Sequence, residues 1–168
     1  SSMPLITGAI IGAMIGFDFG GPVNKTALIF GTAVFTDTVA KYGIQNANFV
    51  PGTAAQAAIS VAPLGIWLAA RIFKKKFTEQ EHISAASHPI QMITASVIGS
   101  AVAGGLAGAT GCKFYGGIGS PLGTIVGYIE QPVPFVTWIA CTFAGILTTA
   151  LIIGFWRKPI TKESNEIE

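Results

Sequence analysis

Five apolar segments alternate along the chain with short polar or glycine-rich stretches. They cover about residues 3–17, 24–40, 53–73, 89–111 and 133–156. A helix needs about 20 predominantly apolar residues to cross the hydrocarbon core of a bilayer, and several of these segments approach that length. The pattern therefore predicts an all-α polytopic integral membrane protein with about five transmembrane helices.

The stretch over residues 112–131 interrupts this pattern. It contains Gly116, Gly117, Gly119, Pro121, Gly123 and Gly127. Glycine and proline at this density break a regular helix. Because irregular backbone at membrane depth needs surrounding protein or water, we expect a glycine-rich hairpin here, either re-entrant or extracellular.

Small residues recur at every fourth position in two of the segments. The first stripe is Gly8, Gly12 and Gly16, and the second is Ser96, Ser100, Gly104 and Gly108. Positions four apart lie on one face of a helix, and small residues on a face let a second helix approach closely in lipid. Ordinary close helix packing is the favoured interpretation of the first stripe, and a tightly packed transport core is the alternative.

Two local features refine the predicted helices. Pro63 lies inside the third segment, and because proline has no N–H donor we expect a kink there. Asp37 lies near the end of the second segment, and Lys41 follows it by four residues. This is the spacing of an ion pair on a helix surface, so we expect Asp37 to lie at the interface and not inside the protein.

Composition narrows the class of protein. The chain has 168 residues, of which 51% are hydrophobic and 11% charged, and its mean hydropathy is +0.60. Proteins average about 25% charged residues, so this composition agrees with a membrane protein. The formal charge of +2 does not indicate a nucleic-acid partner, because the basic residues cluster at the predicted membrane edges.

Cysteine and histidine usage gives no sign of a metal site or a disulfide framework. Cys112 follows an apolar segment and Cys141 lies inside one, which is typical of small apolar packing residues. His82 and His88 lie in an expected loop, with no Cys or His at helical ligand spacing beside them. We expect no metal and no cofactor.

Lysine and arginine set the expected topology. Arg71 and the three lysines 74–76 follow the third segment, and Arg157 and Lys158 follow the fifth, with Lys162 just beyond. Short loops rich in these residues stay in the cytoplasm, so both flanks should share that side. Counting back three crossings from the first flank puts the N-terminus outside and residues 18–25 near the cytoplasmic side.

The two ends of the chain carry further expectations. The chain begins Ser1-Ser2-Met3 without a basic region or a clear cleavage site, so we expect no signal peptide. A start directly on a membrane segment suggests a fragment, or one half of a larger domain. Residues 1–158 are expected to form the membrane domain, and residues 159–168 a polar cytoplasmic tail.

The chain is organised around the stretch that joins the first two segments, Asp-Phe-Gly-Gly-Pro-Val-Asn-Lys over residues 18–25. Charge near a bilayer is costly and is therefore usually functional or interfacial. Gly-Gly-Pro cannot continue a regular helix. We expect a turn that faces a polar site, with Asn24 or Lys25 opening the next helix. The alternative is an interfacial ion pair between Asp18 and Lys25 that shapes the turn.

This stretch, DFGGPVNK, closely resembles the DMGGPVNK motif of the fructose-type membrane subunit (EIIC) of the bacterial sugar phosphotransferase system. Three further stretches agree in order. KFTEQE over residues 76–81 is similar to that family's KFTEEE loop, GSAVAGG over residues 99–105 is similar to its GSAVAGA helix, and Gly116-Gly117-Ile118 resembles the end of its PHGGIF motif. The resemblance covers nearly the whole chain.

The resemblance implies a function and a set of partners. The family's membrane subunit binds a sugar, fructose or a related hexose or hexitol, from outside and turns it inward, where a phosphocysteine on the EIIB component phosphorylates it. It implies EIIB and EIIA partners and a homodimer in the lipid bilayer of a bacterial inner membrane, with a cytoplasmic C-terminus. Because both cysteines lie at or in the membrane, this chain carries no phosphoryl-accepting residue of its own.

The resemblance also implies which residues bind the substrate, while no catalytic residue is expected. They are Asp18, Gly20, Gly21, Pro22, Asn24 and Lys25. Asp18 can accept hydrogen bonds from sugar hydroxyls, and Asn24 can both donate and accept them. Lys25 can attract a phosphate or pair with Asp18.

Departures from the family pattern leave two rival functions open. The family's GITEGAIPF-like segment, between the KFTEEE loop and the GSAVAGA helix, is absent here. Tyr115 stands in place of the histidine before Gly116, and the N-terminal half of the family's domain is missing. The first rival is a truncated or regulatory EIIC-like membrane module that transports nothing. The second is an unrelated small transporter or channel.

Overall fold

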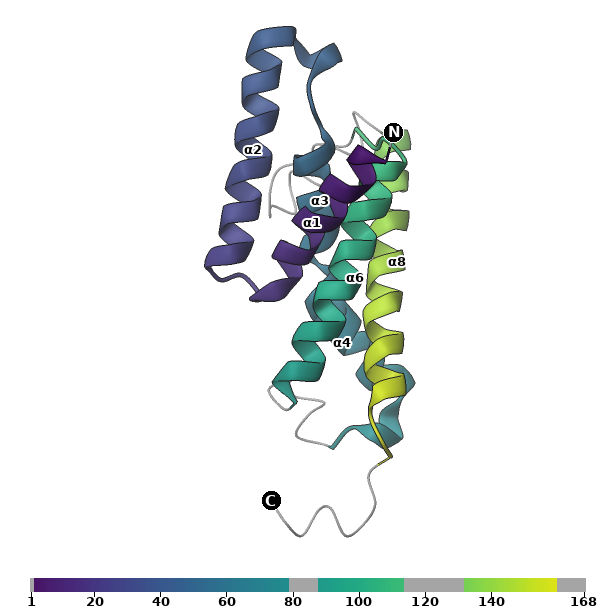
Figure 1. Cartoon of the computed structure of the whole chain (residues 1–168). Coiled ribbons are helices and arrows are strands. Elements are labelled where there is room, and N and C mark those ends of the chain that lie inside the picture. Colours follow the sequence, from purple (N-terminus) through teal and green to yellow (C-terminus); the bar gives the residue numbers. More distant parts are fainter. Residues whose placement is uncertain (1, 79–87, 114–131, 160–168) are drawn as a thin grey trace.

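The computed structural model describes residues 2–78, 88–113 and 132–159. Its α-helices are α1 (Met3–Phe17), α2 (Pro22–Tyr42), α3 (Val50–Ile59), α4 (Val61–Ile72), α6 (Pro89–Ala109) and α8 (Pro132–Trp156), with short 3₁₀ turns η1 (Ile44–Asn46) and η2 (Lys74–Lys76) (Figure 1). The described residues contain no strand, which confirms the all-α class. The predicted glycine-rich hairpin lies almost entirely outside them.

Proline marks the start of most of these helices. Pro4, Pro22, Pro51, Pro89 and Pro132 each lie at the first or second helical position. A residue there has no intrahelical partner for its N–H, and proline has no N–H and a fixed helical φ. The expectation that Asn24 or Lys25 opens the second helix is therefore wrong, because α2 already begins at Pro22.

Within the described ranges, three stretches are long and apolar enough to cross a bilayer. They are Val50–Ile72, which joins α3 to α4, together with α6 and α8. The 15 residues of α1 reach about 22 Å at 1.5 Å per residue, less than the hydrocarbon core of about 30 Å. The 21 residues of α2 are long enough, but they include Lys25, Asp37 and Lys41. The prediction of about five crossings stays a prediction.

The predicted kink at Pro63 is confirmed as a break between α3 and α4 at Ser60. Proline has no N–H to donate to the carbonyl four residues earlier, which here belongs to Ile59. Leu64 donates to the carbonyl of Ser60 at 3.3 Å, so regular bonding resumes immediately after the gap. The sequence thereby divides one membrane-length stretch into two shorter helices.

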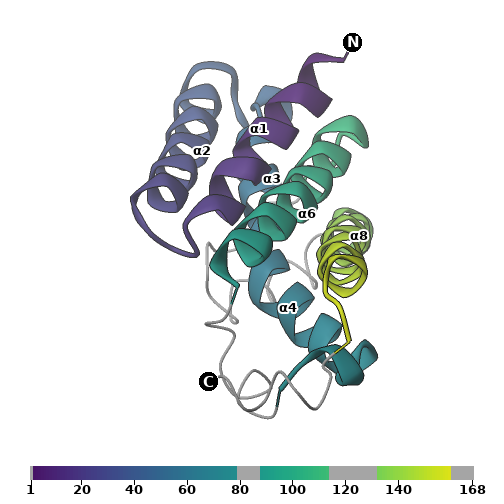
Figure 2. The same cartoon turned by 60° about the horizontal axis from the view of Figure 1, so that its bottom comes forward.

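The two predicted small-residue stripes pack against each other, and α1 and α6 are antiparallel. The facing pairs are Pro4 with Gly108, Gly8 with Gly104, Gly12 with Ser100, and Gly16 with Ser96. A β-carbon added at these glycines would collide with main-chain or serine atoms of the partner helix. Close packing, the favoured interpretation, is confirmed (Figures 1 and 2).

The helix α8 packs against α6 and α4. A side chain at Gly99 or Gly145 would meet the other helix's backbone, so α6 and α8 also touch through glycine. Thr149 donates its hydroxyl to the carbonyl of Ala95 at 3.2 Å, inside this contact. Gly65 of α4 lies against Thr149. Both views place α2 and α8 on opposite sides of the α1–α6 pair (Figures 1 and 2).

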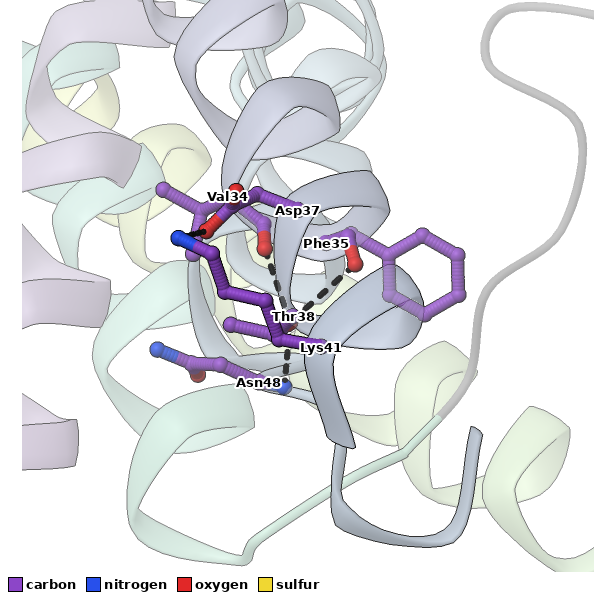
Figure 3. A network of polar contacts seen from close by, with 6 residues as sticks. All are labelled: Val34, Phe35, Asp37, Thr38, Lys41 and Asn48. Atoms are coloured by element: carbon purple, nitrogen blue, oxygen red, sulfur yellow. Dashed lines mark hydrogen bonds and ion pairs between the residues drawn. The ribbon is translucent and has the colours of Figure 1, made fainter. Parts of the chain in front are cut away.

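A polar network holds the far end of α2 against the loop that leads to α3 (Figure 3). The Thr38 hydroxyl donates to the carbonyl of Val34 at 2.7 Å and accepts the Asn48 N–H at 2.9 Å. Lys41 and Asp37 form the predicted ion pair at 2.9 Å, with both side chains exposed. An exposed pair of this kind contributes little to stability, so the network serves mainly to place the loop.

The basic segments after α4 and α8 lie at the same end of the bundle. Lys76 donates to the carbonyl of Gly154 at 2.7 Å. The buried Arg157 guanidinium lies 4.3 Å from the centre of the Phe77 ring, and the Phe73 ring occupies the space beside Gly154. If both basic segments lie on the same side of the membrane, as predicted, they must lie at the same end of the bundle, as they do. That this end faces the cytoplasm stays a prediction.

Neither cysteine forms a disulfide. Cys141 is buried in the contact between α8, α6 and the start of α4. Cys112 is buried just after α6, and its thiol lies 3.2 Å from the carbonyl oxygen of Pro134 in the first turn of α8. The prediction that both are small packing residues is confirmed, and Cys112 in addition ties together the ends of two helices.

Candidate functional site

The turn between α1 and α2 is formed by residues in left-handed conformations. Phe19 has φ of 51° and Gly20 has φ of 106°. Glycine reaches such angles without steric cost, whereas a bulky residue such as Phe19 adopts them at a cost of about 1–3 kcal/mol. The N–H of Gly21 then donates to the carbonyl of Asp18 at 3.1 Å and closes the turn.

The Asp18 carboxylate caps the first turn of α2. Its Oδ2 accepts the N–H of Val23 at 2.7 Å, and its Oδ1 accepts the N–H of Asn24 at 3.1 Å. These N–H groups have no intrahelical partner, and a negative charge at a helix N-terminus is favourable. A side chain at Gly21 would collide with the carboxylate, so the second glycine of the motif makes room for the cap.

Asn24 ties the two helices together from inside. Its side chain is 6% exposed, and its amide nitrogen donates to the carbonyl of Ile15 at 2.9 Å. That carbonyl lies in the last turn of α1, where main-chain acceptors have no intrahelical partner. The bond satisfies a buried group that would otherwise be left unpaired.

Lys25 takes no part in the hydrogen bonds of Asp18 and Asn24. It is exposed, and it forms no ion pair with any carboxylate of the described residues. The alternative in which Asp18 and Lys25 pair to shape the turn is therefore not what is observed, because main-chain N–H groups hold Asp18 instead. The Lys25 ammonium is left to meet solvent or an anion.

The turn lies partway along the bundle. Gly16 at the end of α1 faces Ser96, and seven residues of α6 precede Ser96. At 1.5 Å per residue these cover about 10 Å. The prediction that this turn lies near the cytoplasmic side thus needs refinement, because the turn stops about two helical turns short of the beginning of α6. Irregular backbone at such depth needs surrounding protein or water.

The structure brings Asp18, Gly21 and Asn24 together, and leaves Gly20, Pro22 and Lys25 on the exposed side of the same turn. Two polar residues near it were treated only as packing positions in the sequence, namely Ser96 and Ser100. Both face Gly16 across the α1–α6 contact. The signal that could have singled them out is their hydroxyl group, since the other two residues of that stripe are glycines.

The other stretches that carried the resemblance are only partly described. Residues 99–105 lie inside α6, where they pack against α1 and α8. Lys76, Phe77 and Thr78 are described, and the remaining residues of that motif lie outside the described ranges, as do Tyr115 and residues 116–118. The position of those residues relative to the α1–α2 turn is therefore not part of the site described here.

Comparison with known proteins identifies relatives along almost the whole chain. A PTS system fructose-specific EIIABC component of Bacillus subtilis (strain 168) is 32% identical over 181 residues, which cover 95% of this chain and 26% of that protein. A fructose permease IIC component of Bacillus amyloliquefaciens is 32% identical over 180 residues, covering 95% of this chain and 54% of that protein.

A PTS system fructose-specific EIIC component of Haloferax volcanii is 29% identical over 170 residues, covering 88% of this chain and 41% of that protein. No family model and no solved structure matches the chain. The chain spans between about a quarter and about half of the length of these three relatives. Because two of them are named as IIC components alone, the shared stretch belongs to the membrane part. The chain is therefore homologous to the fructose-specific IIC membrane components of the phosphotransferase system.

Proposed function

We propose that this chain is a membrane component of a fructose-type sugar permease. In this proposal it binds and translocates a sugar, and the phosphocysteine of a partner EIIB component phosphorylates that sugar. The observation that carries the proposal is the 32% identity over 95% of the chain to a fructose permease IIC component. Its support in the fold is a polar turn within a helix bundle that has membrane-length apolar stretches.

The substrate-binding part of the proposal rests on the residues of the turn. Two backbone N–H groups use one lone pair on each Asp18 oxygen, and an ionised carboxylate has about four acceptor sites. Asp18 therefore keeps capacity to accept sugar hydroxyls while it caps α2. Gly20, Gly21 and Pro22 shape the turn, Asn24 fixes its position, and the exposed Lys25 ammonium is suited to attract a phosphate.

The partners follow from the same homology. We propose fructose or a related hexose or hexitol as substrate, EIIB and EIIA as phosphoryl donors, and a homodimer in the inner membrane as the assembly. The described thiols, Cys112 and Cys141, are both buried in helix contacts. A buried thiol cannot receive a phosphoryl group from a soluble protein, which is why a partner must carry it.

A second candidate function is a truncated or regulatory membrane module that transports nothing. The observation that favours it is the internal use of the motif. Asp18 caps α2 and Asn24 donates to Ile15, so both side chains have an architectural role without any ligand. In this alternative the DFGGPVNK stretch is retained because it builds the turn.

Sugar-dependent phosphorylation in membrane vesicles separates the two candidates. Vesicles that contain this chain would receive purified EIIA and EIIB donor proteins and labelled fructose, and phosphorylated sugar would be measured. The permease proposal expects product that depends on the chain and that falls when Lys25→Ala is introduced. Lys113→Ala, an exposed lysine after α6, is the matched control. Product equal to that of empty vesicles would leave the non-transporting module as the function.

A further inference from the structure

Two serine hydroxyls are buried in the α1–α6 contact without a hydrogen-bond partner. Ser96 and Ser100 are both 0% exposed, and neither Oγ atom forms a hydrogen bond. Threonine hydroxyls elsewhere in the core do form hydrogen bonds: Thr149 donates to the carbonyl of Ala95, and Thr142 donates to the carbonyl of Trp138 at 2.9 Å. A buried polar group without a partner is destabilising and therefore needs an explanation.

Local bonding within α6 does not supply that explanation. A serine inside a helix commonly donates to the carbonyl four residues earlier, which here would be that of Met92 for Ser96 and that of Ser96 for Ser100. Neither bond is formed. The Ser100 hydroxyl instead points at Gly16, where an added β-carbon would lie 2.7 Å from it. Only the missing side chain of Gly16 makes room for it.

The last turn of α1 separates these serines from the candidate site. On one side of that turn Asn24 holds the carbonyl of Ile15, and on the other side Ser96 and Ser100 face Gly16. The Asn24 amide of α2 and the Ser100 hydroxyl of α6 thus reach consecutive residues of α1, Ile15 and Gly16, and Ser96 faces the same turn through its carbonyl oxygen. Displacement of this one turn would let Asn24 and both hydroxyls face a common space.

The packing of α1 on α6 favours such a displacement. Both contact stripes repeat every four residues, so a shift of α1 by one turn, about 5.4 Å, brings small residues opposite small residues again. If α1 shifts toward the C-terminal end of α6, Gly16 would face Ser100, Gly12 would face Gly104 and Gly8 would face Gly108. In that register α1 no longer covers Ser96, and Ser100 lies at the end of α1. One-turn shifts between packed helices are an established type of conformational change.

We propose that Ser96 and Ser100 are sugar-binding residues, covered by the last turn of α1 in the conformation described and uncovered when that turn moves. The ligand class is a sugar because a polyol can both donate to and accept from each hydroxyl. This inference rests on the proposed function and adds residues from α6 to a site that the sequence placed only between α1 and α2.

Accessibility of cysteines tests the uncovering. In the full chain carrying Cys112→Ala and Cys141→Ala, Ser96→Cys and Ser100→Cys would be treated in membranes with a small water-soluble thiol reagent. Both cysteines should react at a slow but measurable rate, because the last turn of α1 uncovers them only part of the time. Bound fructose should lower that rate several-fold, because it would occupy the same space. Ala103→Cys is the matched control, because Ala103 is equally buried in α6 but faces Gly145 of α8, and it should not react.

Stability and binding together test the role of the hydroxyls. Ser96→Ala and Ser100→Ala remove unpaired polar groups, so each should keep or raise the melting temperature while weakening fructose binding about tenfold. Thr149→Val removes a bonded hydroxyl and should lower the melting temperature with unchanged binding.

Three results would overturn the inference. Cysteines at positions 96 and 100 that stay as unreactive as that at position 103 would exclude the uncovering. Alanine variants that bind fructose as the unmodified chain does would exclude a role in binding, and the proposed function would then stand without these serines. An unmodified chain that binds no fructose would remove the proposed function and this inference with it.

Discussion

The side-chain amide of Asn24 donates to the carbonyl of Ile15 at 2.9 Å and joins the first turn of α2 to the last turn of α1. Together with the bonds that the Asp18 carboxylate accepts from the α2 backbone, this bond spans the Gly-Gly-Pro turn. Asn24, which the sequence suggested as a sugar ligand, therefore has a structural role in holding α1 and α2 together. Each role gives a different result on substitution.

Asn24→Ala should lower the free energy of unfolding by about 1–3 kcal/mol, because it leaves the buried Ile15 carbonyl without its donor. Thermal unfolding in detergent measures this loss. Thr26→Ala, in the same turn, removes only an exposed bond to the Pro22 carbonyl and serves as the control. An unchanged melting temperature for Asn24→Ala would show that the bond contributes nothing to holding the helices together.

Substitutions at Asp18 should separate its role as the cap of α2 from the role of its negative charge in binding substrate. Asp18→Ala removes both acceptors of the Val23 and Asn24 N–H groups, and loss of such a cap costs about 0.5–2 kcal/mol. Asp18→Asn keeps an acceptor and should lose less, while removing the negative charge. If sugar phosphorylation falls for Asp18→Asn with little loss of stability, the carboxylate acts on substrate as well as on α2.

Lys25→Ala gives the cleanest separation of function from architecture. The side chain is exposed and unpaired among the described carboxylates, and surface substitutions of this kind change stability by less than about 0.5 kcal/mol. We expect an unchanged melting temperature and reduced sugar-dependent phosphorylation. A lower melting temperature would mean that Lys25 has a structural role that the turn geometry does not reveal.

Adjacent glycines of α6 should respond differently to the same substitution. At Gly104 an added β-carbon would collide with the main chain of α1 at Gly8 and Gly12, whereas at Gly105 it would make ordinary contact with Ala9 at 3.4 Å. Gly104→Ala should therefore destabilise the protein by about 1–3 kcal/mol. Gly105→Ala should be neutral or slightly stabilising, because alanine is the better helix former. Equal melting temperatures for Gly104→Ala and Gly105→Ala would show that α1 can move away from α6 without a loss of stability.

Local periodicity made much of the fold predictable. The four-residue stripes identified the faces that meet, and Pro63 identified the break in the third segment, because both depend only on spacing along one helix. The partners of Asp18 could not be predicted in this way. Whether its carboxylate meets Lys25 or the α2 backbone depends on left-handed angles at Phe19 and Gly20, which a sequence pattern does not specify.

The depth of the turn was equally inaccessible to the sequence. Charge counting places a loop on one side of a membrane but does not say how far the flanking helices extend. Here α1 ends beside Ser96, well inside the length of α6, because the register of two glycine stripes sets where it stops. Register between helices is a tertiary property, so the position of the candidate site emerged only from the packing.

The last prediction concerns topology. Lys75 and Lys158 should face one side of the membrane, and Lys113 the other. The bond from Lys76 to Gly154 and the contact of Arg157 with Phe77 hold the first two positions at one end of the bundle. Lys113 follows the opposite end of α6, which runs antiparallel to α8.

Single cysteines at these three positions, with Cys112 and Cys141 replaced by alanine, would be labelled with a membrane-impermeant reagent in sealed vesicles of known orientation. We expect Lys75→Cys and Lys158→Cys to label only from the cytoplasmic side, as basic flanks should, and Lys113→Cys only from the outside. Labelling of the first two from opposite faces would require an odd number of crossings between them. That result cannot be reconciled with the contact between Lys76 and Gly154, and it would exclude this arrangement of α4 and α8.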